Sequence, residues 1–103
     1  MGHELYLHLE KPCTGSLAEV LAPVLGPDEL LVESSLRVES PERVAVATRE
    51  TIGSQWPHCC DLLLETPTRI YALAHNHAGV QIIRRFTDHL LASGLKVEID
   101  DDV

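Results

Sequence analysis

The residues of this chain best suited to chemistry are histidines and cysteines in its second half. Imidazole nitrogens and thiolate sulfurs are preferred zinc ligands, and a zinc site needs several of them converging on one point. The candidates are His58, Cys59, Cys60, His75 and His77. They show no C-x-x-C or H-x₃₋₅-H spacing, and adjacent cysteines on a strand point to opposite faces. We therefore expect buried thiols and helix-capping residues here, with no metal and no cofactor.

A thiol nucleophile is the other chemistry that these residues allow. A reactive cysteine needs a helix N-terminus or a nearby cation that favours its thiolate. Cys13 precedes a predicted helix by a few residues, but no motif surrounds it or the other cysteines. Three cysteines, two of them adjacent, indicate reduced thiols in a cytosolic protein. We expect a protein that is not an enzyme, and a small metal-binding or thiol-dependent enzyme is the alternative.

Other catalytic and cofactor motifs are lacking in the sequence. The 6 glycines are scattered and form neither a dinucleotide-binding loop nor a P-loop. Acid–base chemistry by two carboxyl groups needs apolar surroundings that give the groups different pKa values. Most carboxylates of this chain fall on the polar faces of predicted strands or in turns, where we expect water to solvate them. The sequence therefore does not indicate a reaction.

Acidity is the strongest feature of the composition. The chain has 16 Asp and Glu against 8 Lys and Arg, a formal net charge of -8 on 103 residues. The acids concentrate in residues 1–42 and in the last six residues, whereas residues 43–97 have a small excess of bases. Such a field favours encounters with basic partners and opposes binding to nucleic acid.

The N-terminal part is predicted to form a strand and then a helix. Leucines alternate with polar residues over 3–10, which is typical of a half-buried strand. Ser16 and Glu19 match a capping box, which marks the start of a helix. Pro23 lacks the N–H that the last helical turn needs, so this turn should kink or tighten.

The middle of the chain is predicted to form hairpins. Residues 30–39 and 44–52 alternate again, and the polar residues 40–43 between them have turn chemistry. Two shorter apolar runs on either side of Pro67 suggest a second hairpin. Because proline is also common at the first position of a helix, the sequence does not decide whether residues 66–75 form a strand or a helix.

The C-terminal part is predicted to form a helix over 76–93, capped by Asn76 or His77, and a final strand at 95–99. Helices interleaved with mostly antiparallel strands predict an α+β two-layer sandwich with two helices on one face. This is a ferredoxin-like or related split β-α-β arrangement, with residues 1–103 as a single domain. No signal peptide or membrane span is visible, so we expect a cytoplasmic protein that binds no membrane.

An interaction surface follows if the first and last strands pair antiparallel, because their outward side chains then share one face. This predicted partner-binding face consists of Glu4, Tyr6, His8, Glu10, Glu98 and Asp100, next to Asp101 and Asp102. Tyrosine supplies rigid contact area, and carboxylates steer a basic partner. A second acidic surface is the alternative, made of Asp28, Glu29, Glu33, Glu39 and Glu42.

Small size, strong acidity and the lack of a secretion signal or catalytic motif make this chain resemble bacterial immunity and antitoxin-type proteins. The resemblance implies a non-enzymatic inhibitor that covers the active site of a basic toxin, such as a nuclease, with carboxylates in place of phosphates. An oligomeric regulatory or ligand-sensing domain that pairs through a free sheet edge is a further alternative. The oligomeric state and the partner's identity stay open.

Overall fold

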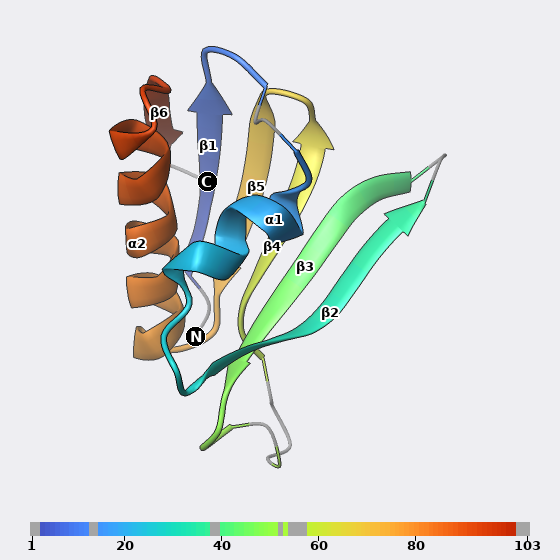
Figure 1. Cartoon of the computed structure of the whole chain (residues 1–103), viewed down its shortest axis with the longest axis vertical. Helices are drawn as coiled ribbons and strands as arrows, with labels where there is room; N and C mark the ends of the chain where they lie inside the picture. Colours follow the sequence, from blue (N-terminus) through green and yellow to red (C-terminus); the bar gives the residue numbers. More distant parts are fainter. Residues whose placement is uncertain (1–2, 13–14, 38–39, 52, 54–57, 101–103) are drawn as a thin grey trace.

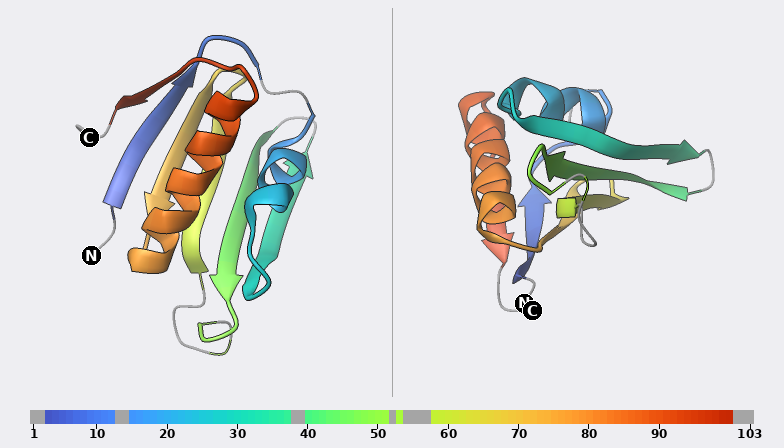
Figure 2. Two further views of the ribbon diagram at one scale, coloured as in Figure 1. Left: turned by 60° about the vertical axis from the view of Figure 1, so that its left-hand side comes forward. Right: turned by 90° about the horizontal axis from the view of Figure 1, so that it is seen from below.

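Two helices lie on one face of an antiparallel sheet in the computed structural model of the protein (Figures 1 and 2). The structure describes residues 3–12, 15–37, 40–51, 53 and 58–100. In chain order the elements are β1 (His3–Leu9), α1 (Leu17–Leu21), a short 3₁₀ helix η1 (Ala22–Val24), β2 (Glu29–Arg37), β3 (Ser40–Thr48), β4 (His58–Thr66), β5 (Arg69–Ala74), α2 (His77–Ala92) and β6 (Val97–Asp100). The predicted α+β class is confirmed.

Within the described residues the strands form one sheet in the order β2-β3-β4-β5-β1-β6, and each pair of neighbours is antiparallel. Because β5 and β6 both flank β1, they run parallel to each other, and α2 connects them across β1. Together β5, α2 and β6 form a split β-α-β unit with β1 between the two strands. The β3 and β4 strands widen the sheet beyond the β-α-β-β-α-β unit of the ferredoxin-like fold.

Local signals in the sequence set the helix boundaries. The Ser16 hydroxyl accepts a hydrogen bond from the Glu19 N–H at 3.1 Å, and the Glu19 carboxylate accepts one from the Ser16 N–H at 3.4 Å. After α1 the chain tightens into η1 at Pro23, as the missing N–H predicts. The Asn76 side chain caps α2 by accepting from the Gly79 N–H at 2.9 Å, and Gly94, with φ of 91°, follows its end.

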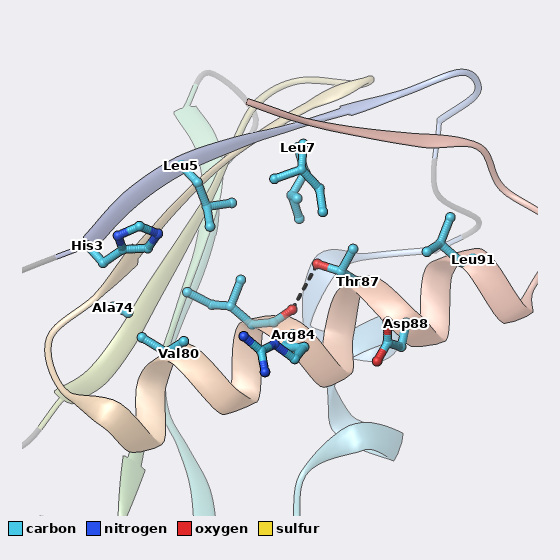
Figure 3. A pocket seen from close by; sticks show the side chains of 11 residues that line it. His3, Leu5, Leu7, Ala74, Val80, Arg84, Thr87, Asp88 and Leu91 are labelled. Carbon is cyan, nitrogen blue, oxygen red and sulfur yellow. Dashed lines mark hydrogen bonds between the residues drawn. The ribbon is translucent and has the colours of Figure 1, made fainter. Parts of the chain in front are cut away.

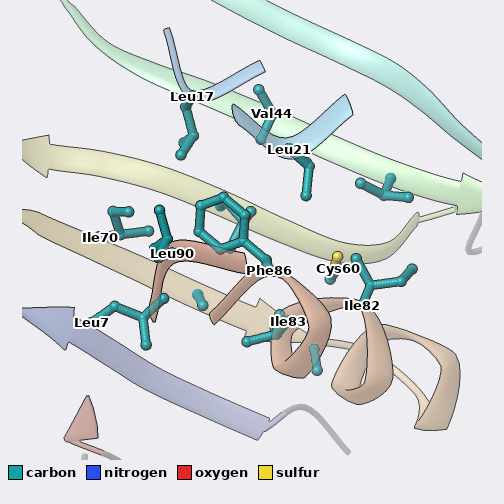
Figure 4. Packing of buried hydrophobic residues seen from close by; sticks show 14 of the residues in the cluster. Leu7, Leu17, Leu21, Val44, Cys60, Ile70, Ile82, Ile83, Phe86 and Leu90 are labelled. Atoms are coloured by element: carbon teal, nitrogen blue, oxygen red, sulfur yellow. The ribbon is translucent and has the colours of Figure 1, made fainter. Parts of the chain in front are cut away.

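The core lies between the sheet and both helices (Figure 4). Phe86 of α2 is fully buried among aliphatic side chains, and the core residues drawn include Leu7 from β1 and Leu21 from α1. Gly79 allows α2 to approach β4 closely, because a Cβ there would lie 1.9 Å from the Cys59 carbonyl oxygen. Glycine at this position therefore fixes how tightly α2 packs on the sheet.

The hairpins differ in part from the predictions. The expected turn at residues 40–43 is wrong, because β3 already begins at Ser40, which pairs with Arg37. Residues 66–75, left open between strand and helix, form the end of β4, a turn at Pro67 and the β5 strand. The turn-type residues 40–43 belong to β3, in which Arg43 pairs with Ser35 of β2 on one side and Leu63 of β4 on the other.

Candidate protein-binding face

One face of the sheet is covered by α1 and α2, and no helix of the described residues covers the other (Figure 2). We call the uncovered side the open face. On β1, Leu7 and Leu9 are buried toward the helices. Since side chains alternate along a strand, Tyr6 and His8 point to the open face. The same alternation on β4 and β5 decides which of their side chains share it.

Pairing of the first and last strands brings the predicted face together. The β1–β6 register sets Tyr6 opposite Asp100 and His8 opposite Glu98. Directly opposed residues of an antiparallel pair point to the same side, so these four side chains share the open face. The His8 Nε2 lies 3.9 Å from Asp100 Oδ2, with both side chains nearly half exposed. The predicted antiparallel pairing of these two strands is confirmed.

The remaining acids of this group border the same side chains. Glu4 precedes Tyr6 on β1 and is exposed, and Glu10 follows the strand and is also exposed. The backbone N–H of Glu10 donates to the Lys96 carbonyl at 3.0 Å, which continues the β1–β6 ladder by one residue. Asp101 and Asp102 lie outside the described residues.

Two tyrosines and an arginine occupy the centre of the open face. Tyr6 lies opposite Tyr71 of β5, with ring centroids 5.3 Å apart. The guanidinium carbon of Arg69 lies 4.1 Å from the centroid of the Tyr6 ring, a cation–π contact, and its Nε lies 3.2 Å from Glu65 Oε1. Burial raises the pKa of Tyr71, and its hydrogen bond to Glu4 raises it further. Tyr71 therefore remains a neutral donor that ties β5 to β1.

Sequence reasoning did not place Tyr71 and Arg69 on this face. The alternation of buried Ile70, Ala72 and Ala74 is visible in the sequence and could have shown that Arg69 and Tyr71 point away from the core. Their meeting with Tyr6, however, depends on β5 pairing with β1, and sequence pattern does not give that register.

A polar cluster around Asp61 lies further along the open face. The Asp61 carboxylate lies 2.6 Å from His75 Nε2, 3.3 Å from His58 Nδ1 and 3.3 Å from a terminal nitrogen of Arg43. Its side chain is only 13% exposed. The contacts join β3, β4 and the residue that follows β5, so the cluster ties these strands together. The sequence suggested two of its histidines as metal ligands but missed the carboxylate between them.

The five candidate metal ligands do not converge. His58 and His75 meet at Asp61, whereas Cys59 and Cys60 are free thiols buried in the core. His77 lies at the start of α2, where its Nε2 is 3.0 Å from the Gln81 side-chain nitrogen. Among the described residues no group of three or more His, Cys, Asp or Glu side chains is arranged to hold a metal ion.

The buried thiols are poorly suited to nucleophilic chemistry. Burial raises the pKa of Cys60 to about 12, and the neighbouring Cys59 and Asp61 raise it as well. Cys59 packs in the same core, with its sulfur 3.5 Å from the Thr51 hydroxyl. A reactive cysteine requires the opposite environment, one that favours the thiolate. The third candidate, Cys13, lies outside the described residues.

Two members of the second acidic surface proposed from the sequence have contacts within the fold. Glu42 is only 5% exposed, and its carboxylate accepts from the N–H groups of Leu17 at 2.5 Å and Ala18 at 3.1 Å. Glu29 accepts from the Gly26 N–H at 2.6 Å and pairs with Arg85. These two carboxylates are therefore engaged in contacts within the fold, which makes them weaker candidates for a partner contact than exposed acids.

The other members of that surface contribute little to one patch. Asp28 is exposed and pairs with Arg49 at 3.4 Å. The side chain of Glu33 and the whole of Glu39 lie outside the part of the chain that the structure describes. Of the two acidic surfaces, the one on β1 and β6 is therefore the better candidate for a contact.

No helix in the described residues has the length and apolar character needed to cross a membrane. Comparison of the chain with protein-family models, curated proteins and solved structures finds no match.

Proposed function

We propose that this chain is a non-enzymatic protein-binding module whose open face receives a basic protein partner. The observation that carries the proposal is the β1–β6 register, which gathers Tyr6, His8, Glu98 and Asp100 on a face that no described helix covers. A sheet face built from a tyrosine, a histidine and carboxylates is chemically suited to lysine- and arginine-rich surfaces.

The charges of this face are available to a partner. Glu10 and Glu98 are exposed and form no ion pair among the described residues. They therefore need not break an internal contact before they meet a cation. Together with the net charge of -8, they raise the rate of encounter with a basic protein.

The tyrosine pair supplies the apolar part of the contact. Tyr6 is held by Tyr71 and Arg69, so it loses little conformational freedom when a partner packs on it. Aromatic anchors surrounded by charged residues are the usual arrangement of residues that dominate binding energy. The acids then govern the association rate, and Tyr6 governs how long the complex lasts.

Inhibition of a basic toxin is the specific role that we propose. In this role the chain acts in the cytoplasm as an immunity or antitoxin-type protein and covers the active site of its partner. A nuclease is a suitable target, because the carboxylates of the open face occupy sites that otherwise bind phosphates. The raised pKa of the Cys60 thiol supports a binding role over a thiol-dependent catalytic one.

Affinity capture with matched baits tests this proposal. The face variant combines Glu98→Gln with Asp100→Asn, and the control variant combines Asp28→Asn with Glu50→Gln, which removes the same charge from exposed positions elsewhere. We expect a basic protein from the source cell to be retained by the wild type and the control and to be lost from the face variant. If all three baits retain the same proteins equally, the open face is not the contact.

A further inference from the structure

A cavity of about 250 Å³ lies between α2 and the β1 and β6 strands, on the side of the sheet opposite the open face (Figure 3). Pockets for drug-sized ligands range from about 300 to 1,000 Å³, so this cavity suits a smaller molecule. Its depth is formed by β1 and α2, and its mouth opens beside the short β6 strand.

The walls of the cavity are apolar. Leu5 and Leu7 of β1 lie across it from Val80 of α2 (Figure 3), and Ile83 of α2 also lines it. The Thr87 hydroxyl already donates its proton to the Ile83 carbonyl at 2.9 Å, so it has no proton left to donate to a ligand. The interior therefore selects a hydrocarbon or aromatic group and offers little to a polar one.

Large apolar side chains also border the mouth. Leu91 of α2 is 48% exposed, and Ile99 of β6 is 53% exposed. Both side chains line the cavity, and exposed apolar residues at a cavity often mark ligand sites. A small molecule in the cavity would shield both side chains.

Charges of both signs line the same cavity. Arg84 and Asp88 stand four residues apart on α2, a spacing at which opposite charges usually pair with each other. Neither side chain forms an ion pair among the described residues. One cation and one anion, one helical turn apart and without an ion-pair partner in the part of the chain that the structure describes, thus line an apolar cavity.

We propose that this cavity binds a free amino acid with an apolar side chain. The side chain fills the space between β1 and α2, the carboxylate pairs with Arg84, and the ammonium group pairs with Asp88. A fatty acid would place its carboxylate near the like charge of Asp88 and has no cation to pair with that residue. An alkylamine would place its ammonium group near the like charge of Arg84 and has no anion to pair with it. A zwitterion satisfies both charges at once.

Titration followed by two-dimensional amide NMR tests the proposal with three related compounds. L-leucine carries both charges, N-acetyl-L-leucine lacks the ammonium group, and L-leucine amide lacks the carboxylate. We expect L-leucine to cause saturable shifts at the amides of Val80, Thr87 and Ile99. Each analogue should bind about tenfold more weakly, because it leaves one rim charge unpaired.

Surface variants separate the two charges without disturbing the core. Arg84→Gln should weaken L-leucine binding about tenfold but leave the affinity for L-leucine amide, which lacks the carboxylate, unchanged. Asp88→Asn should also weaken L-leucine binding about tenfold but leave the affinity for N-acetyl-L-leucine, which lacks the ammonium group, unchanged. Arg49→Gln, which removes an equal charge from the end of β3, should bind like the wild type.

Three outcomes overturn the proposal. They are the absence of saturable shifts with L-leucine, binding of either analogue as tightly as L-leucine, and an effect of Arg84→Gln no larger than that of Arg49→Gln.

Discussion

The two faces of this sheet use polar residues in opposite ways. On the covered face, Glu42 is buried and holds the first N–H groups of α1, and Cys60 is a neutral thiol in the core. On the open face, Glu98 and Asp100 are exposed, and Tyr6 lies on the surface beside them. Residue type alone therefore does not distinguish a structural carboxylate from an exposed one, such as Glu98, that is available to a partner. Its burial and its contacts within the fold do, since Asp61 also lies on the open face but is only 13% exposed and is held by three neighbours.

Glu42→Ala should have the largest effect on stability. The substitution leaves two N–H groups at the buried start of α1 without an acceptor, so we expect the free energy of unfolding to fall by about 2–4 kcal/mol. Urea denaturation measures this value. Glu98→Ala, which removes an exposed carboxylate, serves as the control and should change it by less than about 0.5 kcal/mol. Equal effects of the two substitutions would erase the contrast between the faces.

Alkaline pH should destabilise the protein through Cys60. Its pKa is 9.0 when exposed and about 12 in the fold. The unfolded chain thus loses its proton first as the pH rises above about 9, and stability falls until the folded thiol also ionises. Between about pH 8 and pH 10.5 this costs about 2 kcal/mol.

Denaturation at these two pH values, on the wild type and on Cys60→Ala, isolates the contribution of the thiol. The variant should start from a lower stability but lose less of it with pH, because its side chain does not titrate. An identical pH dependence in both proteins would show that Cys60 ionises as easily in the fold as in the unfolded chain.

Tyr6→Ala should have an intermediate effect. It removes the ring contact with Tyr71 and the cation–π contact with Arg69, which together stabilise the fold by about 1 kcal/mol at this partly exposed position. Thermal or urea denaturation gives the change. A loss as large as that of Glu42→Ala would mean that the open face is built as a core and not as a binding surface.

Glu98→Gln combined with Asp100→Asn should have the smallest effect on folding. Both carboxylates are exposed, so we expect a change in the free energy of unfolding below about 0.5 kcal/mol. Urea denaturation of this double variant provides the number. A larger loss would give these acids a structural role like that of Glu42.

Features that depend on neighbours in the chain were predictable from the sequence. The capping box of Ser16 and Glu19, the tightened turn at Pro23 and the cap at Asn76 all involve residues within four positions of one another. The alternation of leucines over residues 3–10 gave the β1 strand for the same reason. Since these patterns are local, no knowledge of the fold is needed to recognise them.

Features that depend on distant residues were missed. Residues 40–43 have turn chemistry, yet they belong to β3, in which Arg43 pairs with Leu63 of β4 and Glu42 reaches α1, more than twenty residues earlier in the chain. The Asp61 cluster and the Tyr6–Tyr71 pair arise from the registers of β4 with β5 and of β5 with β1. The candidate face was predictable because it needs only the pairing of the first and last strands, while its aromatic centre needs the full strand order.

The association rate between this protein and its captured basic partner, measured at low and high salt, tests the binding role of the open face most directly. The Glu98→Gln and Asp100→Asn double variant should associate about tenfold more slowly than the wild type at low salt and should depend less on salt. The Asp28→Asn and Glu50→Gln control should keep most of the wild-type rate. If the control slows association while the face variant matches the wild type, the contact lies elsewhere on the molecule.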